Sequence, residues 1–494
     1  MEEKENTENA EMGKRKHSHD TKIVIKYYYE RIRQNTGNFL KWMGLSVLTG
    51  LVVGGASAVF AGCIKAATEY RDTHNWIFML LPVAGVLIVF MYEKIGRQDG
   101  GTNQVLATIK SKDDVPFLSA PLIFVSTLLT HLTGGSAGRE GASIQFGGSI
   151  GNWLGKLAHL DEFDHHVMIM CGMSAAFAAV FGTPMAAAVF AMEVVSVGVM
   201  YYAALLPCVI AAIIAAEFAT GMGIDPETFP VHSIPGLTVG TGLKMALIAV
   251  GCGILSILFC ILLKTVGQLY TKYLKNPYIR IVVAAGVIIL ITICLNTKDY
   301  MGAGSGLIAR AIEKGEARPL DFLWKMLLTA LTMRAGYRGG EIVPAFSIGA
   351  TFGCVAGGIL GFSPELAAAA SMVALFCGVT NCPITAMLIS FELFGFSGAA
   401  YYLIAISISY AVSGYYSLYK DQTIVYSKYK QDILTVKQDS RILYQRDTDR
   451  MTRAISYISM RKGEAFCIAS PFQVCLAAHN LLIEWYFHFQ CRYQ

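Results

Sequence analysis

The sequence predicts an all-α polytopic membrane protein, and three observations lead to this fold class. Of the 494 residues, 54% are hydrophobic and only 15% are charged. About ten stretches with few or no charges reach or approach the roughly 20 residues that a helix needs to cross a bilayer. The chain also has 48 glycines, which suit close helix packing because lipid offers no hydrophobic drive for association. A soluble protein of this size has no reason to carry so many apolar stretches.

The expected membrane segments follow one another along the chain. In order, they are 42–64, 74–92, 115–138, 167–192, 194–216, 245–263, 281–297, 342–364, 366–391 and 393–419. Several contain Gly or Pro, notably 115–138 and 342–364, and these residues interrupt helices. We therefore expect broken or re-entrant helices among the clean spans.

The N-terminal segment sets the expected orientation. Residues 1–41 carry nine Lys and Arg side chains before the first apolar stretch, and positively charged flanks stay in the cytoplasm. We expect a cytoplasmic basic segment over 1–37, no signal peptide, and a multi-pass protein of the plasma membrane. The net charge of +5 then reflects topology and contact with anionic lipid. The scattered basic residues lack interleaved aromatics, which argues against a nucleic-acid partner.

Metal and cofactor chemistry is not indicated. None of the twelve cysteines forms a CxxC pair, and most lie inside apolar stretches, where cysteine behaves as a small hydrophobe. His165 and His166 are adjacent, but no third ligand accompanies them. We therefore predict neither a metal site nor a cofactor.

The pair Arg139 and Glu140 is the strongest functional signal. They are the only formal charges between Asp114 and Lys156, and glycines flank them on both sides. An ionisable group at membrane depth is costly, so it marks a functional site by default. The glycines allow a helix break and a close approach of backbone N–H groups to a ligand, as in the anion sites that transporters build from half-helix N-termini. The alternative is a structural Arg–Glu ion pair in the protein interior, without a role in transport. We predict anion transport gated by Glu140.

Two motifs recur roughly 200 residues apart and indicate a duplicated unit, and repeats in transporters commonly enclose the substrate site between them. Residues 184–193 and 383–392 each begin with Pro and end with Glu, and the glycine-rich segment at 138 has a counterpart at 340. We predict membrane repeats over 38–220 and 241–430, joined by a Gly- and Pro-rich linker over 221–240. No function is predicted for the tail, 431–494.

These segments resemble motifs of the CLC family of anion channels and transporters, across about residues 40–430. Residues 138–142 (Gly-Arg-Glu-Gly-Ala) resemble the family's GREGP segment, with Ala in place of Pro. Residues 339–344 resemble GGxFxP, and 100–103 (Gly-Gly-Thr-Asn) occupy the place of GSGIP. Tyr426 is matched to the family's inner-gate tyrosine. The resemblance implies the CLC-type inverted-repeat fold and a homodimer with one pathway per subunit.

Departures from the motifs are similar to the fluoride branch, CLC-F, whose members export fluoride in exchange for protons. Thr102 and Asn103 replace Ser-Gly, and Glu341 stands where most chloride-handling members have an apolar residue. Val194 replaces the second glutamate of the pair after Pro184, which is the inner proton acceptor of chloride/proton exchangers. The alternative is a chloride or nitrate/proton antiporter, or a passive anion channel, on the same fold. An enzyme is disfavoured, since the chain has no HExxH or GxSxG motif and no paired aspartates in the spans.

The chemistry of fluoride suggests roles for these residues. Fluoride is strongly hydrated, so its site must replace water with many hydrogen-bond donors. Glu140 is itself an anion that competes for those donors and leaves when protonated, which couples the two ions. Glu341 is either a member of the proton path or a structural partner of Arg334 or Arg338. The candidate residues are Glu140 and Glu341 for proton transfer, and Thr102, Asn103, Gly138, Arg139, Gly141, Ile342, Val343 and Tyr426 for the anion.

Overall fold

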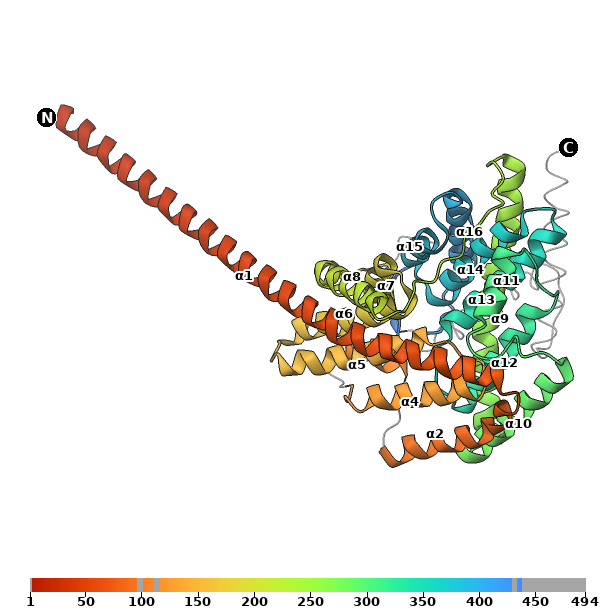
Figure 1. Cartoon of the computed structure of the whole chain (residues 1–494). Helices are drawn as coiled ribbons and strands as arrows, with labels where there is room; N and C mark the ends of the chain where they lie inside the picture. The colour runs from red at the N-terminus through yellow and green to blue at the C-terminus, as the bar shows by residue number, and fades with distance from the viewer. Residues whose placement is uncertain (1, 96–100, 111–114, 429–432, 438–494) are drawn as a thin grey trace, which may run out of the picture. The chain divides into compact units, whose positions relative to one another are not determined.

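The computed structural model describes residues 2–95, 101–110, 115–428 and 433–437, with side chains of the first helix described from residue 26. Within these ranges the chain is mostly helical (Figure 1). The helices of the first half are α1 (Glu2–Thr73), η1 (Ile77–Leu80), α2 (Leu81–Ile95), α3 (Thr102–Thr108), α4 (Ser119–Leu132), α5 (Glu140–Leu157), α6 (Glu162–Phe181), α7 (Pro184–Glu193), η2 (Tyr202–Ala204) and α8 (Leu205–Gly221). Those of the second half are α9 (Val239–Tyr273), α10 (Pro277–Leu295), α11 (Ser305–Glu313), α12 (Asp321–Ala335), α13 (Ile342–Ile359), α14 (Pro364–Thr380), α15 (Pro383–Phe394) and α16 (Ala399–Val412).

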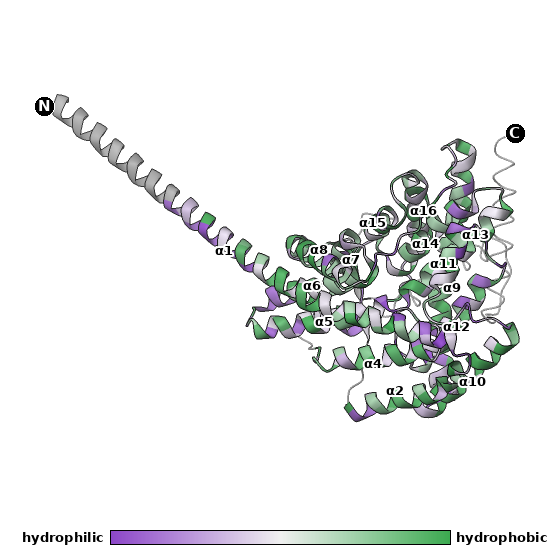
Figure 2. Cartoon of the chain, viewed as in Figure 1, coloured by the Kyte–Doolittle hydropathy of each residue, from purple (hydrophilic) through white to green (hydrophobic). Residues whose placement is uncertain are grey.

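The predicted class, a polytopic helical membrane protein, is confirmed. Seven helical stretches in the described residues are long and apolar enough to cross a bilayer, and hydrophobic residues line most of α2, α8, α9 and α10 (Figure 2). The tail from 438 and residues 429–432 lie outside the described part of the chain.

Two predicted spans were wrong, because each is divided into two helices. The stretch 167–192 breaks at Gly182, and 366–391 breaks at Asn381; both residues have left-handed backbones, with φ of 75° and 59°. A proline at the first turn, Pro184 or Pro383, then starts the next helix, where its missing N–H costs nothing. Helix breaks of the expected kind therefore occur here, whereas 115–138 and 342–364, where they were most expected, each hold a single helix.

Four described helices were missed by the apolar-stretch criterion, namely α3, α5, α11 and α12. Helix α5 is rich in Gly, Ser and Asn, and α12 contains Asp321, Lys325 and Arg334. Most polar residues of α5 and α12 are buried among other helices, so overall hydropathy could not reveal these two helices.

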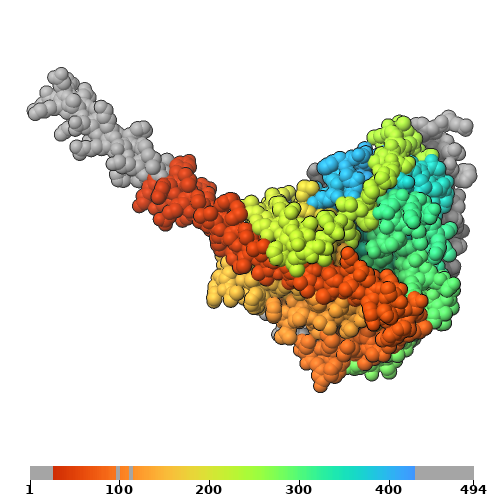
Figure 3. Space-filling model, in the orientation of Figure 1, coloured from red at the N-terminus to blue at the C-terminus, as the bar shows by residue number. Residues whose placement is uncertain are grey.

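Small residues allow the central helices to pack closely. A Cβ added at Gly147 of α5 would lie 2.3 Å from the carbonyl oxygen of Gly172 in α6. The second half repeats this packing, since a Cβ at Gly353 of α13 would lie 2.3 Å from the carbonyl oxygen of Ala367 in α14. Helix α1 packs across α4, α5, α6 and α8, and its contact with α8 is visible on the surface (Figure 3).

The two halves also correspond through a reciprocal helix cap. Glu193 at the end of α7 accepts hydrogen bonds from the amides of Ile384 (3.1 Å) and Thr385 (2.8 Å), at the start of α15. Glu392 near the end of α15 accepts from the amides of Met185 (2.8 Å) and Ala186 (2.9 Å), at the start of α7. Helices α7 and α15 are therefore antiparallel, and each carboxylate faces the positive end of the other helix dipole. The repeat and linker boundaries themselves stay a prediction.

A small sheet was not predicted. It consists of β1 (Ser196–Val197), β2 (Thr423–Tyr426) and β3 (Ile433–Lys437), with β1 parallel and β3 antiparallel to the central strand β2. Ser196 pairs with Thr423. The sheet fixes the segment after α16 against the chain that leaves α7.

Candidate functional site

The two glycine-rich segments predicted as a repeat lie side by side. The amide of Gly138 donates to the carbonyl of Gly340 (2.7 Å), and the amide of Gly340 donates back to Gly138 (2.6 Å). Helices α5 and α13 each begin two residues later. A Cβ on Gly141 would lie 2.8 Å from the Cα of Gly340, so the absence of a side chain at 141 permits this approach. The N-termini of two half-helices from the two halves of the chain therefore meet.

Backbone donors are available at this meeting point. The first helical bonds of α5 and α13 are donated by Ser143 and Ala345, to the carbonyls of the residues that precede each helix. The amides of Gly141, Ala142, Ile342 and Val343 have no acceptor among the described groups. Unpaired N–H groups at the positive ends of helices can bind an anion, so the predicted anion-binding role of Gly141, Ile342 and Val343 is chemically reasonable at this place.

The Thr102 hydroxyl also lies at the start of α5, whereas the amide of Gly138 already has an acceptor. The Thr102 hydroxyl donates to the carbonyl of Gly141 (3.0 Å), which brings the start of α3 next to the start of α5. The amide of Gly138 is committed to Gly340, so this glycine positions the backbone and does not offer its own N–H to a ligand.

Glu140 is buried at the start of α5, with 1% of its surface exposed. Its carboxylate accepts from the Arg139 amide (3.0 Å) and from Arg139 Nε (3.2 Å). Arg139 Nη2 also donates to Glu227 Oε1 (2.6 Å) and to the carbonyl of Val180 (3.3 Å). The Arg139–Glu140 pair thus forms, but it is part of a larger group that includes a carboxylate from the segment between α8 and α9.

Glu341 is paired with a cation, which is one of its two expected situations. Arg334 Nη2 donates to Glu341 Oε1 at 3.0 Å, and both side chains are partly buried. Arg338, the other candidate partner, places its guanidinium 4.1 Å from the centre of the Tyr92 ring. Glu341 directly precedes the donors Ile342 and Val343, so a role in the proton path stays a prediction beside the structural one.

Tyr426, predicted as the inner-gate tyrosine, lies at the surface of the small sheet. It lies on strand β2 with 48% of its surface exposed, and its Cβ is near Gly198. Tyr419, seven residues earlier, has only 4% of its surface exposed, and its ring centre lies 6.4 Å from that of Phe190. The gate role of Tyr426 stays a prediction, and the structure adds a buried tyrosine, Tyr419, that the sequence analysis did not single out.

Asn103 lies near Tyr419 and holds the loop that carries it. Its side-chain oxygen accepts from the amide of Lys420 at 2.8 Å. Buried aromatic rings continue from Tyr419 through the core towards the chain beside Val180, in contacts of 5.2–6.4 Å between ring centres. They are Phe177, Phe181, Phe190, Phe346 and Phe376. These rings pack the region between the helix N-termini and the Tyr419 loop.

A neutral amide contacts the backbone of Val194, the residue that replaces the second glutamate of the family pair. Gln422 is fully buried, and its Nε2 donates to the carbonyls of Val194 (3.1 Å) and Thr380 (2.8 Å). Its carbonyl oxygen accepts from Asn381 Nδ2 (3.2 Å). Val194 therefore contributes only its backbone here, and Glu193 is committed to the cap of α15.

A buried lysine that the sequence analysis missed supports the loop before Glu140. Lys325 of α12 is 0% exposed, and its Nζ donates to Ser136 Oγ (3.0 Å), the carbonyl of Tyr300 (3.1 Å) and the carbonyl of Gly302 (2.7 Å). All three ammonium donors are thus satisfied by neutral acceptors, and no described carboxylate contacts it. The available signal was a single lysine among the uncharged, mostly apolar residues that lie between Asp321 and Arg334.

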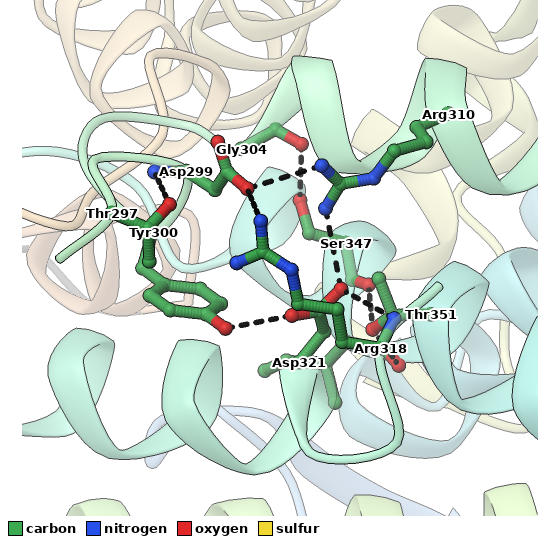
Figure 4. A network of polar contacts seen from close by, with 10 residues as sticks. Thr297, Asp299, Tyr300, Gly304, Arg310, Arg318, Asp321, Ser347 and Thr351 are labelled. Atoms are coloured by element: carbon green, nitrogen blue, oxygen red, sulfur yellow. Dashed lines mark hydrogen bonds and ion pairs between the residues drawn. The ribbon is translucent and has the colours of Figure 1, made fainter. Parts of the chain in front are cut away.

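The loop that receives Lys325 is itself fixed by charges (Figure 4). The Tyr300 hydroxyl donates to Asp321 Oδ1 at 2.6 Å. Buried Asp321 also accepts from Arg310 Nη2 (3.3 Å) and from the Arg318 amide (3.0 Å). Asp299 pairs with Arg310 at 3.1 Å. This network makes the Tyr300–Gly302 segment a rigid acceptor for Lys325, and through Ser136 it supports the segment that leads to Glu140.

A multi-pass helical fold with two facing half-helix N-termini and a buried glutamate between them defines a membrane transport protein. The family model described as voltage gated chloride channel matches residues 84–414. The chain belongs to this family, whose members are transporters and channels, not enzymes.

Individual relatives and solved structures agree with this assignment. The chain is 34% identical over 404 residues to the "Chloride/fluoride channel protein" of Pseudomonas syringae pv. tomato, covering 80% of this chain and 88% of that protein. It is 25% identical to the "H(+)/Cl(-) exchange transporter ClcA" of Vibrio cholerae, covering 71% and 81%. Among solved structures, a "CLC-type fluoride/proton antiporter" superposes with a TM-score of 0.75 at 31% identity, covering 78% of this chain and 98% of the other. A cyanobacterial Cl⁻/H⁺ antiporter superposes with a TM-score of 0.67 at 17% identity, covering 75% and 94%, which shows the fold alone.

Proposed function

We propose that this protein is a secondary active transporter that exports fluoride from the cytoplasm in exchange for protons. The observation that carries the proposal is the meeting of α5 and α13, which places unpaired amides of Gly141, Ala142, Ile342 and Val343 beside buried Glu140. The names of two relatives support the choice of fluoride, since both include it and both exceed 30% identity to this chain.

In the proposed mechanism, the same donors serve two anions in turn. Fluoride binds the backbone N–H groups, which replace the water that it loses. The Glu140 carboxylate competes for this positive region, and its protonation removes the competing charge and admits fluoride. Because the proton enters from outside as fluoride leaves, an inward proton gradient drives export.

Three polar side chains complete the pathway. Thr102 at the start of α3 adds a hydroxyl beside Gly141, and Glu341 is the carboxylate next to the Ile342–Val343 donors. We assign the inner tyrosine to Tyr419 in place of Tyr426, because Tyr419 is buried and Asn103 holds its loop. Hydroxyl groups are good donors for a small anion.

The alternative is a chloride or nitrate/proton antiporter, or a passive anion channel. The relative from Vibrio cholerae favours chloride, since its name specifies H⁺/Cl⁻ exchange. That relative is less similar to this chain than the two whose names include fluoride. The departures at Thr102, Val194 and Glu341 favour the fluoride assignment over this alternative.

We further propose a plasma-membrane location with the N-terminus in the cytoplasm, and a homodimer with an independent pathway in each subunit. The basic residues of the N-terminal segment support the orientation. The dimer rests on the family resemblance, and crosslinking of the purified protein in lipid tests it.

Selectivity is tested by efflux from proteoliposomes loaded with either fluoride or chloride. The proposal predicts that fluoride leaves much faster than chloride at the same gradient. Chloride efflux equal to or faster than fluoride efflux would overturn the fluoride assignment. Empty vesicles of the same lipid measure the leak of hydrogen fluoride that must be subtracted.

A further inference from the structure

The segment between α8 and α9 packs on the C-terminal end of α6. The N-terminal end of α6 lies next to Lys41 of α1. Lys41, at the beginning of the apolar part of α1, forms an ion pair with Asp164 in the first turn of α6. Helix α6 has 20 residues and is therefore about 30 Å long. Its C-terminal end is Phe181–Gly182, and an added Cβ on Gly182 would lie 2.6 Å from the Cα of Pro226. With the N-terminus in the cytoplasm, this end of α6 and the segment packed on it face the outside.

This outer segment is held on both sides of Glu227. Pro226 packs on Gly182, and the amide of Phe229 donates to the carbonyl of Leu393 in α15 (3.0 Å). Phe229 is buried in the core. Glu227 is therefore presented to the protein by a fixed backbone, and its side chain is only partly exposed.

Glu227 and Glu140 share one guanidinium. Arg139 Nη2 lies 2.6 Å from Glu227 Oε1, and Arg139 Nε lies 3.2 Å from Glu140 Oε1. The shorter of the two contacts belongs to Glu227, the carboxylate nearer the outside. Two further cations lie near this region. Lys325 of α12 donates to Ser136, three residues before Arg139 (3.0 Å), and Arg71 of α1 donates to the carbonyl of buried His131 in α4 (3.2 Å).

The balance of charge around Arg139 decides how firmly Glu140 is held as an anion. With both carboxylates ionised, a single positive charge is divided between them. If Glu227 becomes neutral, all of the attraction of Arg139 acts on Glu140 and one repulsive charge is lost. Both changes favour the ionised form of Glu140, so a more acidic solution is then needed to protonate it.

We propose that Glu227 is a positioning residue for the gate, which draws Arg139 outward and so sets the external acidity at which Glu140 accepts a proton. The proposal rests on the proposed function, because it acts through Glu140 as the proton-coupled gate. Glu227 itself need not touch the transported anion.

The test is the external pH dependence of proton-coupled fluoride efflux from proteoliposomes, in the wild type and in Glu227→Gln. The midpoint is expected to move to lower external pH by about 0.5 to 1 unit, from the loss of a unit charge several ångströms from Glu140. Asp225→Asn is the matched control: it removes the same charge from the same segment, but Asp225 is exposed and no described cation contacts it. Its midpoint is expected to stay within about 0.2 units, because exposed charges are screened.

A midpoint in Glu227→Gln that stays in place, moves to higher pH, or moves no more than in Asp225→Asn would overturn the proposal. Glu227→Asp keeps the charge and is expected to shift the midpoint less than the amide does; an equal shift would contradict the charge argument. The proposed function fails separately. If the wild type exchanges protons for chloride but not for fluoride, the fluoride assignment is wrong. The role of Glu227 is then tested by the same midpoints, measured with chloride. A wild type that moves no protons removes both proposals.

Discussion

Replacing Glu193 by Gln should destabilise the protein without uncoupling it. The Glu193 carboxylate accepts three hydrogen bonds, from the amides of Ile384 (3.1 Å) and Thr385 (2.8 Å) and from the Thr385 hydroxyl (2.6 Å), and it is buried. An amide keeps one oxygen and turns a donor towards these donors. Charge-assisted bonds are about twice as strong as neutral ones, and hydrogen bonds to charged groups contribute about 1.5–3 kcal/mol. A charge at a helix N-terminus adds about 0.3–1 kcal/mol. We therefore expect Glu193→Gln to lower the free energy of unfolding by about 2–3 kcal/mol.

The reciprocal site gives an internal comparison. Glu392 accepts two bonds instead of three and is only partly buried, so Glu392→Gln should cost less, about 1–2 kcal/mol. Glu217→Gln on α8 is the matched control, because Glu217 is exposed and makes no described side-chain contact; its effect should stay within about 0.5 kcal/mol.

In the assay, detergent-solubilised protein is heated, and the midpoint is the temperature at which half of it no longer elutes as a single species. From the unfolding entropy of a chain of this size, each kcal/mol corresponds to about 1 °C, so Glu193→Gln should lower the midpoint by about 2–3 °C. Proton and fluoride fluxes of the same preparation should stay coupled. If Glu193→Gln is as stable as Glu217→Gln, the stabilising role of the Glu193 cap is refuted. If Glu193→Gln loses proton coupling, Glu193 of α7 belongs to the proton path.

Three further predictions follow from the site. Glu341→Gln should severely lower coupled exchange, measured by paired fluoride and pH electrodes, because the nearest carboxylate to the Ile342–Val343 donors is lost; normal coupling would leave Glu341 only its ion pair with Arg334. Gly340→Ala should reduce fluoride efflux about 100-fold, since the new Cβ would lie 2.5 Å from the Gly141 nitrogen and displacements of about 1 Å have such effects; efflux near that of the wild type would contradict the close approach. Lys325→Met should lower the thermal midpoint by about 1–3 °C, because the buried Tyr300 carbonyl loses its donor at about 1–3 kcal/mol. The Gly302 carbonyl and the Ser136 hydroxyl keep their bonds to the Ala137 amide and Thr329, and an unchanged midpoint would argue against this network.

Much of the site could be predicted because its chemistry is local in the sequence. Charged residues flanked by glycines in an apolar background are rare, so the segment around Glu140 could be recognised from the sequence alone. Glu341 was found through the recurrence of small residues in the second half and the resemblance to the GGxFxP motif, whereas the direct contact between Gly138 and Gly340 was not predicted.

The remaining features depend on tertiary contacts. Glu227 lies about 90 residues from Arg139 on an irregular segment, and no periodicity connects the two. Tyr419 and Tyr426 are both in a tyrosine-rich stretch, and only the strand at 423–426 shows which one is buried. Lys325 was missed because its helix looked too polar to cross a bilayer, although its charged end lies among backbone carbonyls.

Coupling through Glu140 is the central claim, and one pair of recordings tests it most directly. Fluoride and pH electrodes follow proteoliposomes that contain either the wild type or Glu140→Gln, with fluoride loaded inside. The wild type should take up protons as fluoride leaves, whereas the variant should show no protein-dependent proton uptake, because an amide side chain does not exchange a proton. Fluoride efflux in the variant should then stop or continue without protons. Full proton-driven fluoride exchange by Glu140→Gln would remove Glu140 from the mechanism.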